Sequence, residues 1–566
     1  MTETLSDLLA KASDLATSGL YSASSATLGK AISLAPNRQD LIVKRAWLDH
    51  QIGNDVAARL KLGNIKFDGK PAMEAAILHM EIDAGANIDA NKNPVSMEKA
   101  NQALKLVLRH LPWGELHERF VSACRELNLF NFLLAFLRDW VQLHGTSKKV
   151  LVRASEVLLE LEEPISAYKM LNYIWEQQEV RSEMELLLGR RKKIREDNPS
   201  QDFKLLDKID RAFDLEDKKL ARVKLPDGQI NPSEVKVLYV GSSIVGAGLE
   251  RSNDIAAHYI ATSKLAGGNC DVWLDTNLVV PQWNRASDRQ VVEAIDEFRK
   301  KLADERPDLL VLDTCTLPTG RGLTPKLLKQ LKKKYKFRVA GLLRDPLKVA
   351  HKNIEAWAIV SDTLICGDPT AFFVRERINH LQKKALFMPI PAFHDPFCSS
   401  PFTPNRDLLF IGSTFGIHRS MLISMLGASS DISIDLVIGR NRRKLAPDEA
   451  SYATLISNSR GVLNISAHHP SVNGHLVTGR VWEAIACRSL LVEQRNLGTE
   501  SFFVPWRHFL PWVNPADLIH GWRIINRHEN YRLRIANAAY EWALRHYNPS
   551  SFWRALVNHG FCRKAS

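Results

Sequence analysis

The sequence has no Cys-x-x-Cys pair and no long apolar run. Its seven cysteines are scattered over 566 residues, which excludes a zinc finger or a dense disulfide framework and favours a reducing compartment. No segment approaches the roughly 18 uninterrupted apolar residues of a membrane span. Residues 1–20 also lack the basic and apolar regions of a secretory signal. We therefore expect a cytoplasmic protein without a membrane-spanning helix.

Acidic residues are fewer than basic ones, 63 against 76, and the formal net charge is +13. Such a surface favours anionic partners, which include phosphorylated small molecules and anionic lipid. No nucleic-acid-binding motif accompanies the charge, so we expect no nucleic acid partner. Hydrophobic residues make up 45% of the chain and charged residues 25%, an ordinary balance for a globular protein. A chain of this length should fold into two or three domains.

The N-terminal part of the chain, 1–200, carries helical periodicity and an internal repeat. A single constant offset aligns Ala12 with Ala46 and Gly19 with Gly53. Small residues at such positions let the two helices of a hairpin approach closely. The pattern resembles a tetratricopeptide repeat, which implies an α solenoid over 1–200 that binds a protein on its concave face. Only two units align well, so an ordinary helical bundle stays open as the alternative.

The sequence period changes after a polar linker at 201–234, which contains Pro-Asp-Gly and Asn-Pro turn signals. Short, continuous apolar runs then alternate with helical patterns, as buried parallel strands and their crossover helices do. The expected strands are 235–241, 270–276, 307–314, 337–345, 363–368, 407–413, 433–439, 461–466 and 489–493. A proline-rich connector separates the fifth strand from the sixth. We predict two Rossmann-like α/β domains, at 235–395 and 396–566.

A phosphate-binding loop is expected in the second α/β domain, because ligands of open α/β sheets bind beyond the carboxyl ends of the strands. One such loop reads Gly412-Ser413-Thr414 and leads into a helix that carries Arg419. Small residues let a ligand approach the backbone, and a helix N-terminus attracts a phosphate. We expect Gly412, Ser413, Thr414 and Arg419 to bind the phosphates of a ligand.

A second loop contains His468 and the turn Asn473-Gly474, and the helix that follows places Arg480 and Glu483 on one face. A guanidinium can bind a diphosphate, and a carboxylate can accept hydrogen bonds from both hydroxyls of a ribose. His468 follows a strand end, from which it can reach the sugar or the phosphates. The combination predicts a nucleotide-diphosphate site. The alternative is an intrahelical salt bridge worth a few tenths of a kcal/mol.

Residues 235–560 resemble the CgeB-type, spore-maturation-like glycosyltransferases of the GT-B fold. The resemblance rests mainly on Arg480-Val-Trp-Glu-Ala-Ile-Ala-Cys487, which stands where these proteins have R-V-F-E-A-L-A-C-G. The chain also resembles weaker motifs of this family at Met388-Pro389, His394-Asp395-Pro396-Phe397, Phe410-Ile-Gly412 and Arg419. The resemblance implies transfer of a sugar from a nucleotide-sugar donor to an acceptor hydroxyl. It also implies that Arg480 binds the diphosphate and Glu483 the ribose, with no obligatory metal and no other cofactor.

Two positions depart from the family pattern. Related retaining enzymes often have a glutamate eight residues before the Glu483 position, where this chain has His475, and Arg488 stands where a glycine usually follows the cysteine. An imidazole can hydrogen-bond a sugar but supplies no carboxylate, so both retention and inversion stay open. We predict His475 as one catalytic group. Asp345, at the end of a predicted strand, is the other, as a base for the acceptor hydroxyl; a helix cap or turn is its alternative role.

The predicted partners are a nucleotide sugar, an acceptor protein or glycan, and a protein bound by the helical repeats. Residues 326–338 predict a basic amphipathic helix whose lysines are solvated or contact an anionic membrane or an acidic acceptor. Two other functions fit the same motifs: a non-catalytic GT-B scaffold joined to a repeat adaptor, and a nucleotide-sugar epimerase. The motifs do not specify the sugar, the nucleotide base, the acceptor or the oligomeric state.

Overall fold

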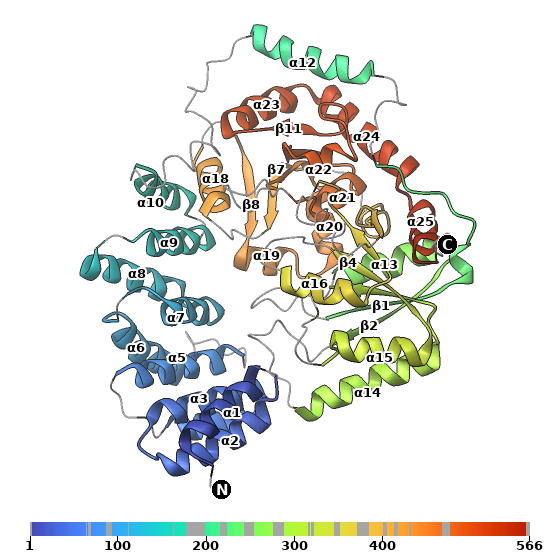
Figure 1. Ribbon diagram of the computed structural model, residues 1–566. Helices are drawn as coiled ribbons and strands as arrows, with labels where there is room; N and C mark the ends of the chain where they lie inside the picture. Colours follow the sequence, from blue (N-terminus) through green and yellow to red (C-terminus); the bar gives the residue numbers. More distant parts are fainter. Residues whose placement is uncertain are drawn as a thin grey trace.

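The structure of the chain is a computed structural model, shown as a ribbon in Figure 1. The described residues are 3–17, 19–63, 65, 69–85, 93–110, 112–145, 147–161, 163–176, 199–215, 223–242, 254–275, 288–314, 317, 322–343, 351–370, 384–399, 404–412, 417–429, 432–466 and 476–561. Within them an N-terminal helical region precedes two α/β domains, each built on one parallel sheet. This order, a helical region followed by two α/β domains, is the predicted one.

The helical region repeats at the interval seen in the sequence. Its helices are α1 (Leu5–Thr17), α2 (Tyr21–Leu34), α3 (Gln39–Gln51), α4 (Asp55–Leu62), α5 (Gly69–Gly85), α6 (Pro94–Val107), α7 (Glu115–Glu126), α8 (Phe130–His144), α9 (Lys148–Glu160) and α10 (Pro164–Glu176). The start of α3 follows that of α1 by the same interval as the start of α4 follows that of α2. Gly19 and Gly53 follow α1 and α3 with φ angles of 74° and 77°, a left-handed conformation that glycine adopts without strain. The repeated glycines therefore reverse the chain between paired helices.

Replacement of Gly53 by alanine is expected to lower the free energy of unfolding of the helical region by about 1 kcal/mol, because a Cβ is disfavoured at this positive φ. The matched control is Gly63→Ala. Gly63 has a right-handed φ of −59°, and a Cβ there would approach no atom closer than 3.6 Å. Urea denaturation followed by circular dichroism measures both. Equal destabilisation by the two variants would contradict the turn assignment.

The first α/β domain contains a six-stranded sheet of order β2-β1-β3-β4-β5-β6, and every paired neighbour is parallel. The strands are β1 (Lys236–Ser242), β2 (Asn269–Asp275), β3 (Leu309–Asp313), β4 (Arg338–Leu343), β5 (Thr363–Cys366) and β6 (Lys384–Phe387). The helices are η3 (Pro232–Glu234), α13 (Asp254–Leu265), α14 (Asp288–Glu305), α15 (Pro325–Tyr335) and α16 (His351–Val360). Tyr239 and Val311 face one hydrophobic core, and Leu238 and Leu310 face the other. Alternate residues thus fill a core on each side of the sheet.

The second α/β domain contains a five-stranded parallel sheet of order β11-β10-β9-β7-β8. The strands are β7 (Arg406–Gly412), β8 (Ile434–Ile438), β9 (Ser459–Asn464), β10 (Leu490–Gln494) and β11 (Leu510–Trp512). The helices are α18 (Ile417–Gly427), α19 (Gly439–Leu445), α20 (Glu449–Ser457), α21 (Gly479–Ala486), α22 (Leu497–Glu500), α23 (Pro515–Arg527), α24 (Glu529–His546) and α25 (Pro549–Phe561). The nine predicted strands are present, and β6 and β11 are additional.

Hydrophobic packing joins the parts of the chain. Leu158 and Leu159 of α9 share a core with Leu422 and Leu426 of α18, so the helical region packs against the second α/β domain. Helix α12 (Pro199–Phe213), within the predicted linker, packs against α23. The final helix, α25, returns to the first domain, where Phe552 and Trp553 lie in the core of the first sheet. In Figure 1, α25 accordingly lies beside α13, and it also contacts β4.

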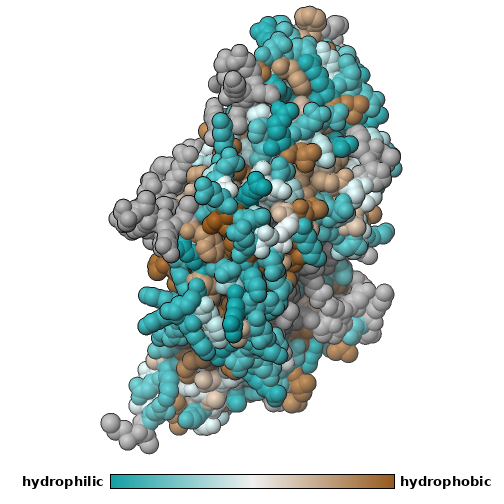
Figure 2. Space-filling view, turned by 90° about the vertical axis from the view of Figure 1, so that its right-hand side faces the viewer, coloured by the Kyte–Doolittle hydropathy of each residue, from teal (hydrophilic) through white to brown (hydrophobic). Residues whose placement is uncertain are grey.

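None of the helices among the described residues is both long and apolar enough to cross a bilayer. On the face shown in Figure 2, hydrophilic residues cover most of the described surface, and hydrophobic residues occur in small groups. The basic helix α15 buries Leu328 and Leu331 and leaves lysines such as Lys329 and Lys333 exposed. This is the amphipathic helix that the sequence predicts.

Candidate active site

The predicted ligand residues that the structure describes lie where the strand order of the second sheet reverses. Strand β7 has β8 on one side and β9 on the other, so consecutive crossovers leave in opposite directions. Ligands of open α/β sheets bind in the crevice at such a switch point, beyond the carboxyl ends of the strands. Gly412 ends β7 and Asn464 ends β9. Helix α21, which carries Arg480 and Glu483, begins close to both ends.

Arg480 lies across the end of the sheet. Its Nη1 donates to Oδ1 of Asn464 at 3.1 Å, and its guanidinium lies 5.7 Å from the centroid of the Phe410 ring. A Cβ at position 412 would lie 3.0 Å from Nη2 of Arg480, so a larger residue there would require this side chain to shift. The sequence prediction for Gly412 was a close approach by a ligand. In the structure the close approach is made by the arginine itself.

Arg419 of α18 is a second guanidinium near Arg480. Its Nη2 donates to the carbonyl oxygen of Ile465 at 2.9 Å, just beyond the end of β9. Burial, and then the positive charge of Arg480, lower the pKa of Arg419 to about 10. Two guanidinium groups close enough to interact offer positive charge to an anionic ligand.

A buried network below Arg480 holds Asn464 in place. Oε2 of Glu493 accepts a hydrogen bond from Nδ2 of Asn464 at 2.7 Å, and its Oε1 accepts one from Thr499 at 3.1 Å. Oγ1 of Thr478 donates to the same Asn464 oxygen that Arg480 uses, also at 3.1 Å. The network therefore fixes the acceptor for Arg480 from the sheet side. Burial raises the pKa of Glu493 to about 8, although three hydrogen bonds oppose this effect.

This shifted pKa predicts a pH-dependent stability. Between the ordinary pKa of 4.5 and about 8, native Glu493 holds a proton that the unfolded chain has released, so the free energy of unfolding falls as pH rises through this window. Glu493→Gln cannot ionise. We expect the melting temperature of this variant to exceed that of the parent protein at pH 9 and the gain to shrink toward pH 5. Calorimetry over this range measures it, and a pH-independent difference would contradict the assignment.

Glu483 lies at the interface between the two α/β domains, with 6% of its surface exposed. Its Oε2 accepts a hydrogen bond from the Tyr452 hydroxyl at 2.6 Å, and its Oε1 lies 3.6 Å from Nε2 of His258 on α13. Burial alone would raise the pKa of Glu483, but His258, Tyr452 and Arg480 together outweigh burial and lower it. The carboxylate is therefore ionised and oriented from both domains.

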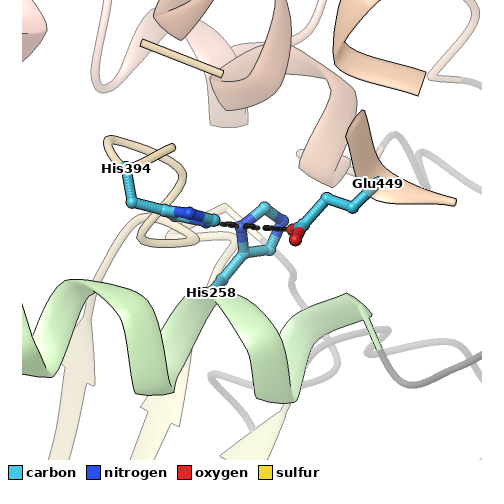
Figure 3. A group of neighbouring side chains, drawn as sticks. All are labelled: His258, His394 and Glu449. Atoms are coloured by element: carbon cyan, nitrogen blue, oxygen red, sulfur yellow. Dashed lines mark hydrogen bonds and ion pairs between the residues drawn. The ribbon is translucent and has the colours of Figure 1, made fainter. Parts of the chain in front are cut away.

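Three further side chains converge beside Glu483. Figure 3 shows His258, His394 and Glu449 pointing toward one another from α13, the interdomain connector and α20. Within the described residues this is the only group of three histidine, cysteine or acidic side chains arranged closely enough to hold a metal ion. Burial, and then the charge of His258, lower the pKa of His394 to about 4.

The structure brings together the four predicted site residues that it describes: Gly412, Arg419, Arg480 and Glu483. The remaining predicted site residues lie outside the described residues; they are Asp345, Ser413, Thr414, His468, Asn473, Gly474 and His475. Arg488, the family departure, has a φ of 58° after α21, and its guanidinium lies 4.3 Å from the Tyr540 ring centroid. An arginine thus occupies the left-handed position at which glycine is favoured.

Sequence reasoning missed the residues that support Arg480 and Glu483. Asn464 ends β9 and Glu493 is the penultimate residue of the neighbouring β10, and a polar residue at the end of an apolar run is a usable signal for a site. Tyr452 and His258 carry no such signal, because each lies within a helical pattern in another part of the chain. Their contacts with Glu483 depend on how the elements pack.

Comparison with known proteins agrees with this geometry. Residues 424–558 match a family model described as glycosyl transferase-like, and the matched segment includes Arg480 and Glu483. No curated protein matches the sequence significantly. The segment that forms most of the second α/β domain thus matches a glycosyl transferase-like model.

Three solved structures illustrate the likeness in fold at low sequence identity. Anabaena HepE in complex with UDP and glucose is 9% identical, with a TM-score of 0.37 over 57% of this chain and 98% of its own. A Thermobaculum terrenum O-GlcNAc transferase mutant is 11% identical, with a TM-score of 0.39 over 86% of this chain and 96% of its own. Sucrose-phosphate synthase from Thermosynechococcus elongatus is 11% identical, with a TM-score of 0.38 over 57% and 97%.

Proposed function

We propose that this protein is a GT-B glycosyltransferase that moves a sugar from a nucleotide-sugar donor to the hydroxyl of a protein or glycan acceptor. The observation that carries the proposal is the position of Arg480 and Glu483. Both lie in the first turns of α21, at the switch point of the second sheet and inside the glycosyl transferase-like segment. A guanidinium can bind a diphosphate, and a nearby carboxylate can accept hydrogen bonds from the ribose hydroxyls.

The donor diphosphate is proposed to bind at the N-terminus of α21. Arg480 offers a planar fork of N–H donors to phosphate oxygens, and the neighbouring Arg419 adds positive charge. The ribose hydroxyls are proposed to donate to Glu483, whose carboxylate is held ionised. Two arginines can neutralise a diphosphate, so we expect transfer to need no metal ion at the phosphates.

The catalytic groups are proposed to come from loops that border this cleft. We retain Asp345 as the base for the acceptor hydroxyl and His475 as a hydrogen-bonding group for the transferred sugar. Ser413, Thr414, His468 and the Asn473-Gly474 turn complete the proposed donor site. All stand between strands in the sequence and lie outside the described residues. The stereochemical course depends on these groups.

The helical region is proposed to recruit the acceptor. Paired helices that recur at a constant interval support a tetratricopeptide-like solenoid, whose concave face suits an extended protein segment. We propose this unit over 1–200, a linker at 201–234, and domains at 235–395 and 396–566. The Arg480–Cys487 block supports CgeB-type membership for the two α/β domains.

The proposed compartment is the cytoplasm. The five cysteines among the described residues have free thiols, as expected where thiols are kept reduced. The exposed lysines of α15 offer a surface for peripheral contact with anionic lipid. Neither feature enters the proposed chemistry.

A screen of nucleotide sugars against the purified full-length protein tests the proposal. A ligand that binds only the native state at 100 times its Kd adds about 2.7 kcal/mol to the stability, so the correct donor should raise the melting temperature. Products are then analysed with and without candidate acceptors. Formation of an epimeric nucleotide sugar without acceptor would identify an epimerase instead. Neither stabilisation nor turnover with any donor would leave only the adaptor role of the helical region.

A further inference from the structure

The group formed by His258, His394 and Glu449 joins both α/β domains. His258 is fully buried on α13 of the first domain, His394 is buried in the connector, and Glu449 begins α20 of the second. Nδ1 of His258 lies 2.5 Å from Nε2 of His394. Oε1 of Glu449 lies 3.8 Å from the first nitrogen and 3.9 Å from the second. The three ligand-type atoms therefore surround one point (Figure 3).

The outer nitrogen of each histidine faces a hydrogen-bond acceptor. Nδ1 of His394 bonds the carbonyl oxygen of Asp395, which places the proton on that nitrogen and a lone pair on Nε2. Nε2 of His258 faces the Glu483 carboxylate at 3.6 Å, which favours a proton there and a lone pair on Nδ1. Two lone pairs and one carboxylate oxygen thus face one another. A shared proton or a metal cation can occupy the point between them, and a metal cation needs both histidines neutral.

We propose that His258, His394 and Glu449 bind one divalent transition-metal cation, of the kind that zinc exemplifies, at the seam between the two α/β domains. Two imidazoles and one carboxylate form a donor set that suits zinc, with a fourth position left open. A carbonyl and a carboxylate on the outer nitrogens are the usual orienting groups of metal-binding histidines.

The geometry requires a modest adjustment. Zn–N bonds of about 2.0–2.1 Å in a tetrahedral site separate two ligand atoms by about 3.3 Å. The two histidine nitrogens, at 2.5 Å, would move apart, and the Glu449 oxygen, at 3.8 and 3.9 Å, would move inward. The required shifts are below about 1 Å. A single shared proton is the competing occupant, and it would join the two histidines without using Glu449.

The cation would join three elements by coordinate bonds, in addition to the contacts that they already make. It would fix α13 of the first domain, the connector and α20 of the second domain in one orientation, with Glu483 orienting one of its ligands. The site is distinct from the proposed phosphate site at Arg480, and its existence does not depend on sugar transfer.

Metal titration of the chelator-treated full-length protein tests this site. We expect one equivalent of Co²⁺ to give the visible absorption of a four-coordinate ion, and Zn²⁺ to displace it and raise the melting temperature. His394→Ala and Glu449→Gln should each weaken binding at least 10-fold, while His520→Ala, a half-buried histidine on α23, should not.

Glu449→Gln keeps the test decisive if the histidine variants fail to fold, because 30% of the Glu449 side chain is exposed at a helix start. Loss of stoichiometric binding in this variant supports the site. Absence of one-to-one binding in the parent protein, or equal binding by Glu449→Gln and the parent, would overturn it and leave a shared proton between the histidines.

Discussion

Arg480→Ala is expected to lower kcat/KM for nucleotide-sugar transfer about 100-fold. The variant loses two charge-assisted hydrogen bonds to the donor diphosphate, together worth about 3 kcal/mol, and each 1.4 kcal/mol is a factor of ten. The fold should survive, because Thr478 still donates to Asn464 and Glu493 still accepts from it. Steady-state kinetics with the donor found in the screen, alongside circular dichroism, make the measurement.

The matched control is Arg406→Ala. Arg406 begins β7 and Gly412 ends it, so Arg406 lies at the opposite end of the strand, where it pairs with Asp435. We expect this variant to keep the kcat/KM of the parent. Arg480→Lys should fall between the two, since an ammonium keeps the charge but loses the planar fork. Equal losses in Arg406→Ala and Arg480→Ala would remove the special role of Arg480.

Glu483→Ala is expected to lower both the melting temperature and the affinity for the donor. Removing one member of a buried charge pair leaves the other uncompensated, at a cost of about 3 kcal/mol. Here His258, which is fully buried, loses the carboxylate that faces it, and the Tyr452 hydroxyl loses its acceptor. The ribose loses its acceptor as well. Thermal denaturation and calorimetric titration of the donor separate the two effects.

Glu483→Gln distinguishes the orientation of the side chain from its charge, and Glu293→Ala is the control. Glu483→Gln keeps the shape and an acceptor for Tyr452, so it should retain more stability than Glu483→Ala while donor affinity stays low. Glu293→Ala removes an exposed carboxylate from a surface pair with Arg289, and such pairs contribute less than about 1 kcal/mol. Wild-type donor affinity in both Glu483 variants would show that the ribose binds elsewhere.

Hydrophobic periodicity was sufficient to predict the architecture. The nine expected strands lie in two parallel sheets, because continuous apolar runs bounded by turn residues have few other stable arrangements. Strand β6 was missed because its run, Lys384–Phe387, continues into a proline-rich connector. Strand β11 was missed because Leu510–Trp512 is very short and contains a proline. Both extra strands are short edge strands, for which the hydrophobic pattern of the sequence is the weakest signal.

The site was predictable only where its residues are close in sequence. Arg480 and Glu483 lie within one turn of the same helix, so helical geometry alone brings them together. His258 and His394 are separated by 136 residues and contribute to the same cluster only after the domains pack. No spacing rule relates such positions. Gly412 was predicted to admit a ligand, and in the structure the side chain of Arg480 lies next to it.

The most direct test of the central claim is a crystal structure of the protein with the nucleoside diphosphate that stabilises it most. The account predicts phosphate oxygens within hydrogen-bond distance of the Arg480 guanidinium and ribose hydroxyls on the Glu483 carboxylate. A nucleotide bound away from the N-terminus of α21, with neither side chain in contact, would contradict it.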